Sequence, residues 1–373
     1  MRFTVSSSTL SNNLMSLAKV INSKNSLAIL ECILFDIRNG QLTMTASDSE
    51  NTMKTTLPLE ESDGEAYVAI SSKKLLDAVR ELPEQPLTFE IDTTNYTVMV
   101  YYQNGQYNFI AENADTFPKD QPIGEESTLI TIESPVLSDN ITRSIFATMQ
   151  DNLHPAMNGI YFDLTAEGLF IVATDGRKLV RNKVLKVSSE TPASFILPKK
   201  PATLLKNVLP KEGDVVIKFD NRSAIISYPD GTLTCRLIDG RYPNYNSVIP
   251  KNNPNQLMVD RKTLLSALRR VLPFASESSQ LIRFQIELGK LEISSEDLDY
   301  ATSAKESIVC DYNGQRMSIG FKGGSFVEAL SNLESDEVII ELGDPSRAGV
   351  IRPATQPEGQ EVLMLIMPML LND

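Results

Sequence analysis

The chain has 373 residues, of which 42% are hydrophobic and 22% are charged, and its formal net charge is −13. This composition is ordinary for a globular protein, and the length allows two or three domains. The 3 cysteines lack the paired spacing of a disulfide framework or a zinc site, and the single histidine argues against catalytic triads and histidine-ligated metals.

Targeting and membrane segments are not evident in the sequence. The first ten residues, MRFTVSSSTL, lack an apolar signal region, and the longest apolar run, 362–371, is about half of what spans a bilayer. We therefore expect a cytoplasmic protein that does not contact a membrane.

The first third of the chain alternates short strands with two amphipathic helices. Leu10, Leu14 and Leu17 recur at helical spacing, and Pro83 ends the second helix. Asn104-Gly105 is typical of a type I′ hairpin turn. The predicted elements, in order, are strand 2–5, helix 7–21, hairpin 32–50, strand 67–70, helix 71–82 and a last hairpin that closes before Phe117-Pro118.

The other two thirds of the chain repeat this order. The second part predicts strand 129–132, helix 137–149, hairpin 161–174, strand 195–197, helix 199–209 and hairpin 215–238. The third part predicts strand 256–259, helix 260–272, hairpin 281–299, strand 317–321, helix 322–333 and the strands 337–342 and 361–367.

One hairpin indicates that the three parts are copies of each other. It reads CILFDIRNGQLTMTASDSE from Cys32, GIYFDLTAEGLFIVATDGRKLV from Gly159 and LIRFQIELGKLEISSEDLD from Leu281. The copies share an aromatic position and a leucine position, occupied by Phe35, Phe162 and Phe284 and by Leu42, Leu169 and Leu291. The repeat length of about 120 to 130 residues is that of one domain and is too long for a solenoid.

The sequence therefore predicts an α+β fold of three tandem domains, each with two short helices on one face of antiparallel sheets. The segments 119–127 and 251–255 are polar, contain proline or glycine, and suit linkers. We place the domains at residues 1–124, 125–250 and 251–373.

The charges are distributed unevenly between the predicted helices and the rest of the chain. The six helices hold thirteen basic and five acidic side chains, a balance of about +8, which leaves about −21 on everything else. One face can then attract a polyanion while the remainder repels it. Few aromatic residues are interleaved with these bases, which favours contact with a nucleic-acid backbone over base stacking. A merely solvated, lysine-rich helix surface is the alternative.

The chain resembles the bacterial DNA polymerase III beta subunits, the sliding clamps, over essentially its whole length. The motifs that carry the resemblance are MRFTV at the start, LAIL near Leu27, NGIYF and VATDGRKL between Asn158 and Leu179, LIDGRYPNY from Leu237, VIPKN at Val248, and MPM at Met367 to Met369. The resemblance implies a ring of two head-to-tail chains, with helices lining a hole through which duplex DNA passes. The residues it implies for DNA contact are Lys24, Lys73, Lys74, Gln150, Lys199 and Lys200.

The resemblance also implies a surface pocket that receives a short extended peptide from partner proteins. Its wall would consist of Met157, Thr174, Gly176, Arg177, Leu179, Pro243, Val248, Leu365, Met367, Pro368 and Met369. An apolar cleft with a few polar groups suits a hydrophobic motif. The chain departs from the family pattern at Leu370, where an arginine is usual, and at Ala156, where an aromatic residue is common. A plain core strand and a plain turn are the alternatives for the tail and for 174–177.

For the contact between the two chains we expect edge-strand pairing and an apolar cluster. Tyr107 and Phe109 would meet the third copy near Leu272 and Phe274. Lys74 would face the acidic residues Glu296, Asp297 and Asp299.

The function implied is that of a non-catalytic processivity factor without metal or cofactor, which tethers the replicative polymerase, the clamp loader and repair proteins to DNA. Two other classes remain open. The carboxylate pairs Asp48 with Glu50 and Glu296 with Asp297 could hold Mg²⁺ in a nuclease. A scaffold that binds proteins but no DNA is the third class.

Overall fold

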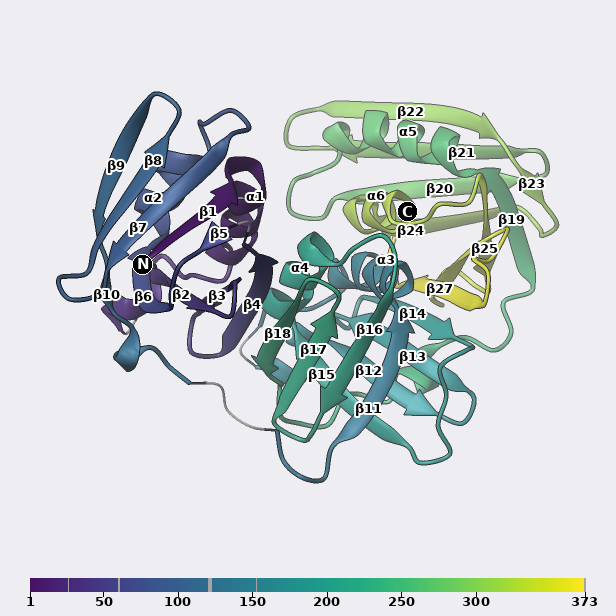
Figure 1. Cartoon of the computed structure of the whole chain (residues 1–373). Coiled ribbons are helices and arrows are strands. Elements are labelled where there is room, and N and C mark those ends of the chain that lie inside the picture. The colour runs from purple at the N-terminus through teal and green to yellow at the C-terminus, as the bar shows by residue number, and fades with distance from the viewer. Residues whose placement is uncertain (26, 60, 120–122, 152, 372–373) are drawn as a thin grey trace. The chain divides into compact units, whose positions relative to one another are not determined.

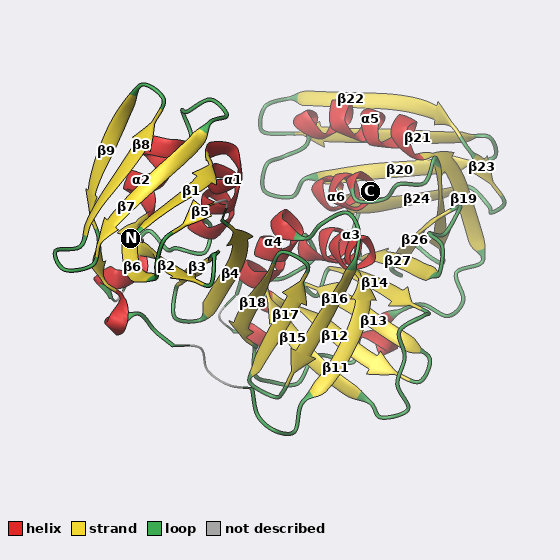
Figure 2. Cartoon of the chain, in the orientation of Figure 1, coloured by secondary structure: helices red, strands yellow, loops and turns green. Residues whose placement is uncertain are grey.

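The computed structural model describes residues 1–25, 27–59, 61–119, 123–151 and 153–371. Within these residues the strands form four sheets, two of five strands and two of nine, and all paired strands are antiparallel. Short helices accompany the sheets, as Figures 1 and 2 show. The predicted α+β class is confirmed.

The elements occur in the predicted order in each copy. The first copy comprises β1 (Arg2–Ser6), α1 (Ser7–Ala18), η1 (Ala28–Glu31), β2 (Cys32–Arg38), β3 (Gln41–Ser47), β4 (Asn51–Pro58), β5 (Glu61–Ser62), β6 (Ala66–Ser71), α2 (Ser72–Val79), β7 (Pro86–Asp92), β8 (Thr97–Tyr102), β9 (Gly105–Ile110), β10 (Glu112–Asn113) and η2 (Ala114–Thr116). The second comprises β11 (Thr128–Glu133), α3 (Ser134–Ile145), η3 (Pro155–Asn158), β12 (Gly159–Thr165), β13 (Gly168–Thr174), β14 (Lys178–Val184), β15 (Ala193–Pro198), α4 (Lys199–Val208), β16 (Asp214–Phe219), β17 (Ser223–Tyr228), β18 (Gly231–Arg236) and η4 (Tyr245–Val248). The third comprises β19 (Asn255–Asp260), α5 (Arg261–Val271), η5 (Leu272–Phe274), β20 (Leu281–Glu287), β21 (Lys290–Asp297), β22 (Thr302–Val309), β23 (Asp311–Tyr312), β24 (Met317–Lys322), α6 (Gly323–Ser331), β25 (Glu337–Leu342), β26 (Gly349–Pro353), β27 (Gln360–Ile366) and β28 (Pro368–Met369).

The repeated hairpin has the same register in all three copies. Phe35 lies opposite Met44, and Phe162 lies opposite Ile171. In the third copy, Phe284 lies opposite Ile293. The three phenylalanines are at most 1% exposed, and the three leucines that follow them in the repeat are fully buried. The shared positions in the sequence are therefore equivalent positions in three cores.

Helix boundaries differ from the prediction where local hydrogen bonding changes. The first helix was predicted over 7–21, but α1 ends at Ala18, because Val20 and Ile21 bond the carbonyls three residues back instead of four. The helix predicted over 137–149 begins earlier, at Ser134, and ends at Ile145. Pro135 falls in its first turn, where a missing N–H costs nothing.

The hairpin predicted at Asn104-Gly105 exists, but its turn is not type I′. Tyr102 lies opposite Gly105 in the β8–β9 pair, so Gln103 and Asn104 form the turn. Type I′ needs positive φ at both turn residues, and neither of them has it.

The two nine-stranded sheets each join two copies of the repeat. The first has the order β10-β6-β2-β3-β4-β18-β17-β16-β11 and joins the copies through β4 and β18. The second has the order β15-β12-β13-β14-β27-β26-β25-β19-β23 and joins them through β14 and β27. The chain therefore packs as two compact units, 1–138 with 200–237 and 139–199 with 238–373, and the strands of the middle copy are shared between them.

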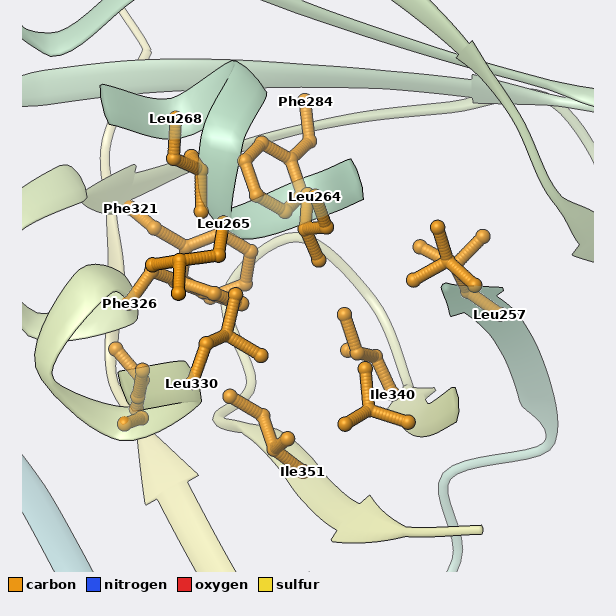
Figure 3. Close-up of a cluster of buried hydrophobic side chains, with 14 of the residues drawn as sticks. Leu257, Leu264, Leu265, Leu268, Phe284, Phe321, Phe326, Leu330, Ile340 and Ile351 are labelled. Carbon is orange, nitrogen blue, oxygen red and sulfur yellow. The ribbon is translucent and has the colours of Figure 1, made fainter. Parts of the chain in front are cut away.

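The core of the third copy shows how its helices are held. Leu264 and Leu268 of α5 and Phe326 of α6 are fully buried, as Figure 3 shows. The ring of Phe326 lies 5.0 Å from that of Phe284 and 4.8 Å from that of Phe321. The helices thus bury one face against the sheets and leave the opposite face for charged residues.

Candidate DNA and peptide sites

The first turns of the helices favour an anion. Among the residues that the structure describes, none of the six α-helices has an acidic residue in its first turn. Three of them carry basic pairs there instead: Lys73 and Lys74 in α2, Lys199 and Lys200 in α4, and Arg261 and Lys262 in α5. Cations oppose the positive end of a helix dipole, so this arrangement lowers helix stability and attracts phosphate.

The basic excess of the helices persists with the observed boundaries. They hold ten basic and three acidic residues, a balance of about +7 instead of +8. Several of these bases are engaged within the protein. Arg143 is 5% exposed and donates to Gln360 Oε1 at 3.1 Å, and burial lowers the pKa of its guanidinium. Arg270 pairs with Glu306, where it lowers the pKa of that carboxyl. The field available to a ligand is therefore smaller than the count suggests.

The structure places most of the predicted DNA residues at accessible positions. Lys24 is exposed in the loop after α1, and Lys73 and Lys74 are exposed in α2. In the other compact unit, exposed Gln150 and half-exposed Lys199 line one cavity of about 460 Å³.

Lys200 differs from the rest of the DNA set. Its Nζ lies 2.6 Å from Val20 O, 2.7 Å from Asn22 Oδ1 and 2.5 Å from Asp48 Oδ2. Burial alone would raise the pKa of Asp48, but hydrogen bonds from Lys200 and Asn51 outweigh it and lower that pKa. Because the folded pKa is depressed, the contact stabilises the fold above the unfolded pKa and is lost as the pH falls through the folded value.

The predicted peptide pocket is assembled by bonds between two segments far apart in the chain. Met367 N–H donates to Arg177 O at 2.8 Å, and Leu179 lies opposite Leu365 in the β14–β27 pair. Thr174 Oγ1 donates to Lys178 O at 2.8 Å, which fixes the turn between β13 and β14. In that turn Gly176 has a φ of 83°, the left-handed region that favours glycine.

The loop around η4 is fixed on the same apolar cluster. Tyr242 and Tyr245 are buried with Leu179 and Leu365. The ring of Tyr242 stacks 4.6 Å from that of Tyr161. Pro243 and Val248, which lie beside these tyrosines in the chain, are exposed. The buried tyrosines therefore fix the loop on which the exposed pair lies.

The C-terminal tail carries other residues of the predicted pocket. After β27 the chain crosses to another sheet, where Met369 of β28 lies opposite Gly320 of β24. Met367 at the crossing is 41% exposed, whereas Leu365 is 3% exposed. Pro368, Met369 and, in η3, Met157 are half-buried. Leu365 is thus a core residue, and the accessible apolar surface is that of the methionines.

The residues predicted for the chain-to-chain contact lie at open sheet edges. Tyr107 and Phe109 belong to β9, which is the last strand of its five-stranded sheet. Leu272 and Phe274 belong to η5, which packs on β22, the outermost strand of the other five-stranded sheet. Phe274 is 39% exposed.

The carboxylates considered for Mg²⁺ have a structural role that the repeat explains. Asp48 and Asp175 follow β3 and β13, and Asp297 is the last residue of the equivalent strand β21. Each accepts the backbone N–H groups two and three residues ahead. Such a turn occupies one carboxylate oxygen. Across the described ranges, no three His, Cys, Asp or Glu residues cluster as metal ligands would. The aspartates are therefore turn residues.

The structure also shows the surroundings of the three cysteines and the single histidine. Cys32, Cys235 and Cys310 are buried and free. His154 is exposed beside Asp151, with 3.4 Å between Nδ1 and Oδ2. In the part of the chain that the structure describes, no helix is both long and apolar enough to cross a membrane.

Sequence reasoning missed one basic residue. Lys262 is exposed in the first turn of α5, at the end where α2 and α4 carry their lysines. The signal was present in the sequence as the pair Arg261-Lys262 at the start of the fifth predicted helix. Only the structure separates the two, because Arg261 donates to Leu330 O and Ser335 O while Lys262 remains at the surface.

Three tandem α+β copies, basic helix ends and open strand edges at both ends of the repeat define the class of DNA clamps. Three family models match this chain. The model of the N-terminal domain of the DNA polymerase III beta subunit matches residues 1–120, that of the central domain matches 131–244, and that of the C-terminal domain matches 246–370. The chain belongs to this family and is a sliding clamp of DNA polymerase III.

Individual relatives are distant but match over the full length. The beta sliding clamp of Pseudomonas putida is 26% identical over 366 residues, covering 98% of this chain and 99% of the relative. That of Bacillus subtilis is 24% identical over 380 residues, covering 99% of each. The crystal structure of the DNA polymerase III subunit beta from Pseudomonas aeruginosa superposes with a TM-score of 0.91 at 24% identity, covering 100% of both chains. This last likeness concerns the fold.

Proposed function

We propose that two copies of this chain close head to tail into a ring around duplex DNA, as a non-catalytic accessory subunit in the cytoplasm that tethers the polymerase and other proteins with a clamp-binding motif. The observation that carries the proposal is the set of exposed lysines in helix first turns. We place the domain limits at 124/125, which falls between the first two family matches, and at 250/251, which falls just inside the third match, since that match begins at residue 246.

Contact with DNA would be made to phosphates and not to bases. Lys24, Lys73, Lys74, Gln150 and Lys199 are the proposed contacts. Lysine ammonium groups and helix N-termini bind phosphate without reading sequence, and few such contacts keep the affinity low enough for sliding. Ring closure then supplies the retention that this affinity does not.

The two internal junctions between copies have the same construction. At the first, Met53 of β4 lies opposite Leu233 of β18, and at the second, Val180 of β14 lies opposite Met364 of β27. Each junction strand is the third strand of the repeated hairpin unit, and each partner is the last long strand of the following copy. The pairing therefore follows one rule, which we call the junction rule: the third hairpin strand of one copy pairs with the last long strand of the next copy.

The rule leaves one junction to be made by a second chain. In the third copy the equivalent of Met53 is Ala304 of β22, since Met53 lies opposite Ala46 and Ala304 lies opposite Ser295 at the same place in the hairpin. In the first copy the equivalent of Leu233 is Tyr107 of β9. We therefore propose that β9 of one chain pairs with β22 of the other, with Tyr107 opposite Ala304.

Exposed apolar residues and charge support this pairing. Ile110 at the end of β9 is 71% exposed, and Val309 at the end of β22 is 84% exposed. An apolar edge strand without a partner invites pairing with another chain. Lys74 would face the acidic residues Glu296, Asp297 and Asp299 across the junction.

The peptide site would bind a short extended segment along the tail. Met367 and Met369 adapt to different side chains, because methionine is flexible and polarizable. Exposed Pro243 and Val248 form the opposite wall. With Leu370 in place of arginine and Ala156 in place of an aromatic residue, the cleft favours an apolar peptide end over an acidic one.

The ring predicts retention that depends on the topology of the DNA. Loaded on a closed circular duplex, the protein should remain bound in high salt, because sliding cannot release it and salt weakens only the phosphate contacts. Linearising the same duplex should release it. Gel filtration of the complexes measures this, with the uncut circle as the control, and equal loss from both forms would contradict the ring.

The tail methionines predict a selective loss of partner binding. Met367→Ala with Met369→Ala should lower the affinity for a fluorescent peptide bearing the clamp-binding motif by about tenfold or more, since truncating central anchors usually costs over 1 kcal/mol of binding free energy. Fluorescence anisotropy measures the affinity, and light scattering should show an unchanged mass. Met15→Ala is the matched control, because Met15 is 43% exposed on α1 and Met367 is 41% exposed. Unchanged peptide affinity in the double variant would remove the pocket assignment.

A further inference from the structure

The segment 19–25, which follows α1, carries Lys24 and has little regular structure. Val20 and Ile21 N–H donate to Leu17 O and Ala18 O at 3.0 and 3.2 Å, and Asn25 Nδ2 donates to Asn22 O at 3.0 Å. These bonds are local, and the fully buried Val20 side chain packs only the start of the segment into the core.

Lys200 adds a second attachment, from a position 180 residues away from Val20 in the sequence. Two of its three bonds reach the segment, at Val20 O and Asn22 Oδ1, and the third reaches Asp48 Oδ2. An ammonium group has three N–H donors, so all of them are used. No donor is left for a phosphate oxygen.

Burial makes this contact costly to break. The Asp48 side chain is 4% exposed and the Lys200 side chain is 34% exposed. If Lys200 turned toward DNA, the Asp48 carboxylate would lose its cation while buried, which is strongly unfavourable. Lys200 is therefore held toward the interior of its own compact unit.

We infer that Lys200 is a positioning residue: it holds the segment 20–25 so that Lys24 is presented to the DNA backbone, and it does not contact phosphate itself. The inference rests on the proposed function, which assigns Lys24 to DNA. A segment ordered before binding loses less conformational freedom when Lys24 meets a phosphate, so the fixed segment binds more tightly.

Hydrogen–deuterium exchange of the full-length protein tests the attachment without DNA. In Lys200→Met, peptides that cover residues 19–25 should exchange about tenfold faster, because two anchoring hydrogen bonds are lost. Asn22→Ala removes one acceptor and leaves the buried ion pair intact, so it should accelerate the same peptides less and guards against misfolding of the first variant. Lys206→Met is the matched control on the same helix, since Lys206 is exposed. Unchanged exchange in both test variants would overturn the inference.

A double-mutant cycle on a short labelled duplex tests the link to Lys24. Lys200→Met should weaken binding in the wild-type background and should have almost no effect in the Lys24→Ala background, because it acts through Lys24. The slope of log K against log salt should fall by at most about 0.9, the value of one phosphate contact. Additive losses, with a slope lowered by twice that amount, would show that Lys200 touches phosphate and overturn the inference. If Lys24→Ala alone changes nothing, the assignment of Lys24 fails, while the exchange experiment still decides whether Lys200 holds the segment.

Discussion

Tyr107→Glu should convert the ring into single chains. Tyr107 lies on the open edge of β9, and the junction rule places it opposite Ala304 and diagonal to Glu306 of the other chain. The substitution removes an aromatic side chain from the contact and adds a negative charge beside an acidic one. Loss of such an anchor costs about 2 kcal/mol or more, which raises the dimer dissociation constant about thirtyfold or more. Sedimentation over a concentration series measures the mass, and retention on circular DNA should disappear with the dimer.

A control on another edge strand separates this effect from a general loss of solubility or fold. Leu129 is 60% exposed on β11, which ends the first nine-stranded sheet, so Leu129→Glu should leave the mass unchanged. The register has its own test: Tyr107→Cys with Ala304→Cys should crosslink under mild oxidation, whereas Tyr107→Cys with Glu306→Cys, offset by two residues, should crosslink much less. A Tyr107→Glu protein that stays dimeric, or a stronger crosslink in the offset pair, would contradict the rule.

Much of the fold could be predicted from local patterns. Phe35, Phe162 and Phe284 recur within alternating hairpins, and alternation reports burial on one face of a strand. Their equivalence is confirmed, and the order of helices and strands is confirmed with it. The peptide-site segments were identified from the resemblance alone. Composition and spacing favoured a core strand there, and for Leu365 the structure confirms that reading.

The features that were missed depend on contacts between distant residues. The pairing of Met53 with Leu233 joins the strands β4 and β18, and no periodicity of the sequence predicts that these two strands meet. The junction rule and the division into two compact units both follow from such pairings. Lys200 and Lys199 are adjacent and equally basic in the sequence. Only the positions of Val20, Asn22 and Asp48 show that Lys200 is directed toward the first copy of the repeat, within its own compact unit. A count of basic residues in the helices therefore overestimates the positive charge that is accessible to a ligand.

The aspartate turns show how a repeat distinguishes a structural role of a residue from a metal-binding role. Asp48 with Glu50 looked like a metal pair when considered alone. Asp175 and Asp297 make the same hydrogen bonds in the other two copies, without an equivalent of Glu50 at the same offset in the second copy, where Arg177 stands. A feature that recurs three times with only its turn bonds preserved belongs to the fold, and this leaves the helix lysines as the groups proposed to act on DNA.

Reversing three of these lysines should abolish processive synthesis while leaving the dimer intact. Lys73→Glu, Lys199→Glu and Lys262→Glu together remove three basic side chains from helix first turns and place acids at helix ends proposed to face DNA. Lys74 is left unchanged, because it is proposed to face the partner chain. The slope of log K against log salt should fall by about 2.7, since each contact contributes about 0.9. Anisotropy with a short duplex measures the slope, and primer extension on a circular template measures processivity.

The control for this variant must carry the same change in net charge. Lys211, Lys218 and Lys251 are exposed and lie outside the helices, so reversing these three lowers the net charge of −13 by the same amount. Long-range repulsion from DNA would then be equal in the two proteins, and only the loss of local contacts would differ. If both triples weakened binding equally, net charge and not the helix ends would govern the interaction. If the first triple still supported processive synthesis, the chain would act as a protein scaffold whose helices do not meet DNA.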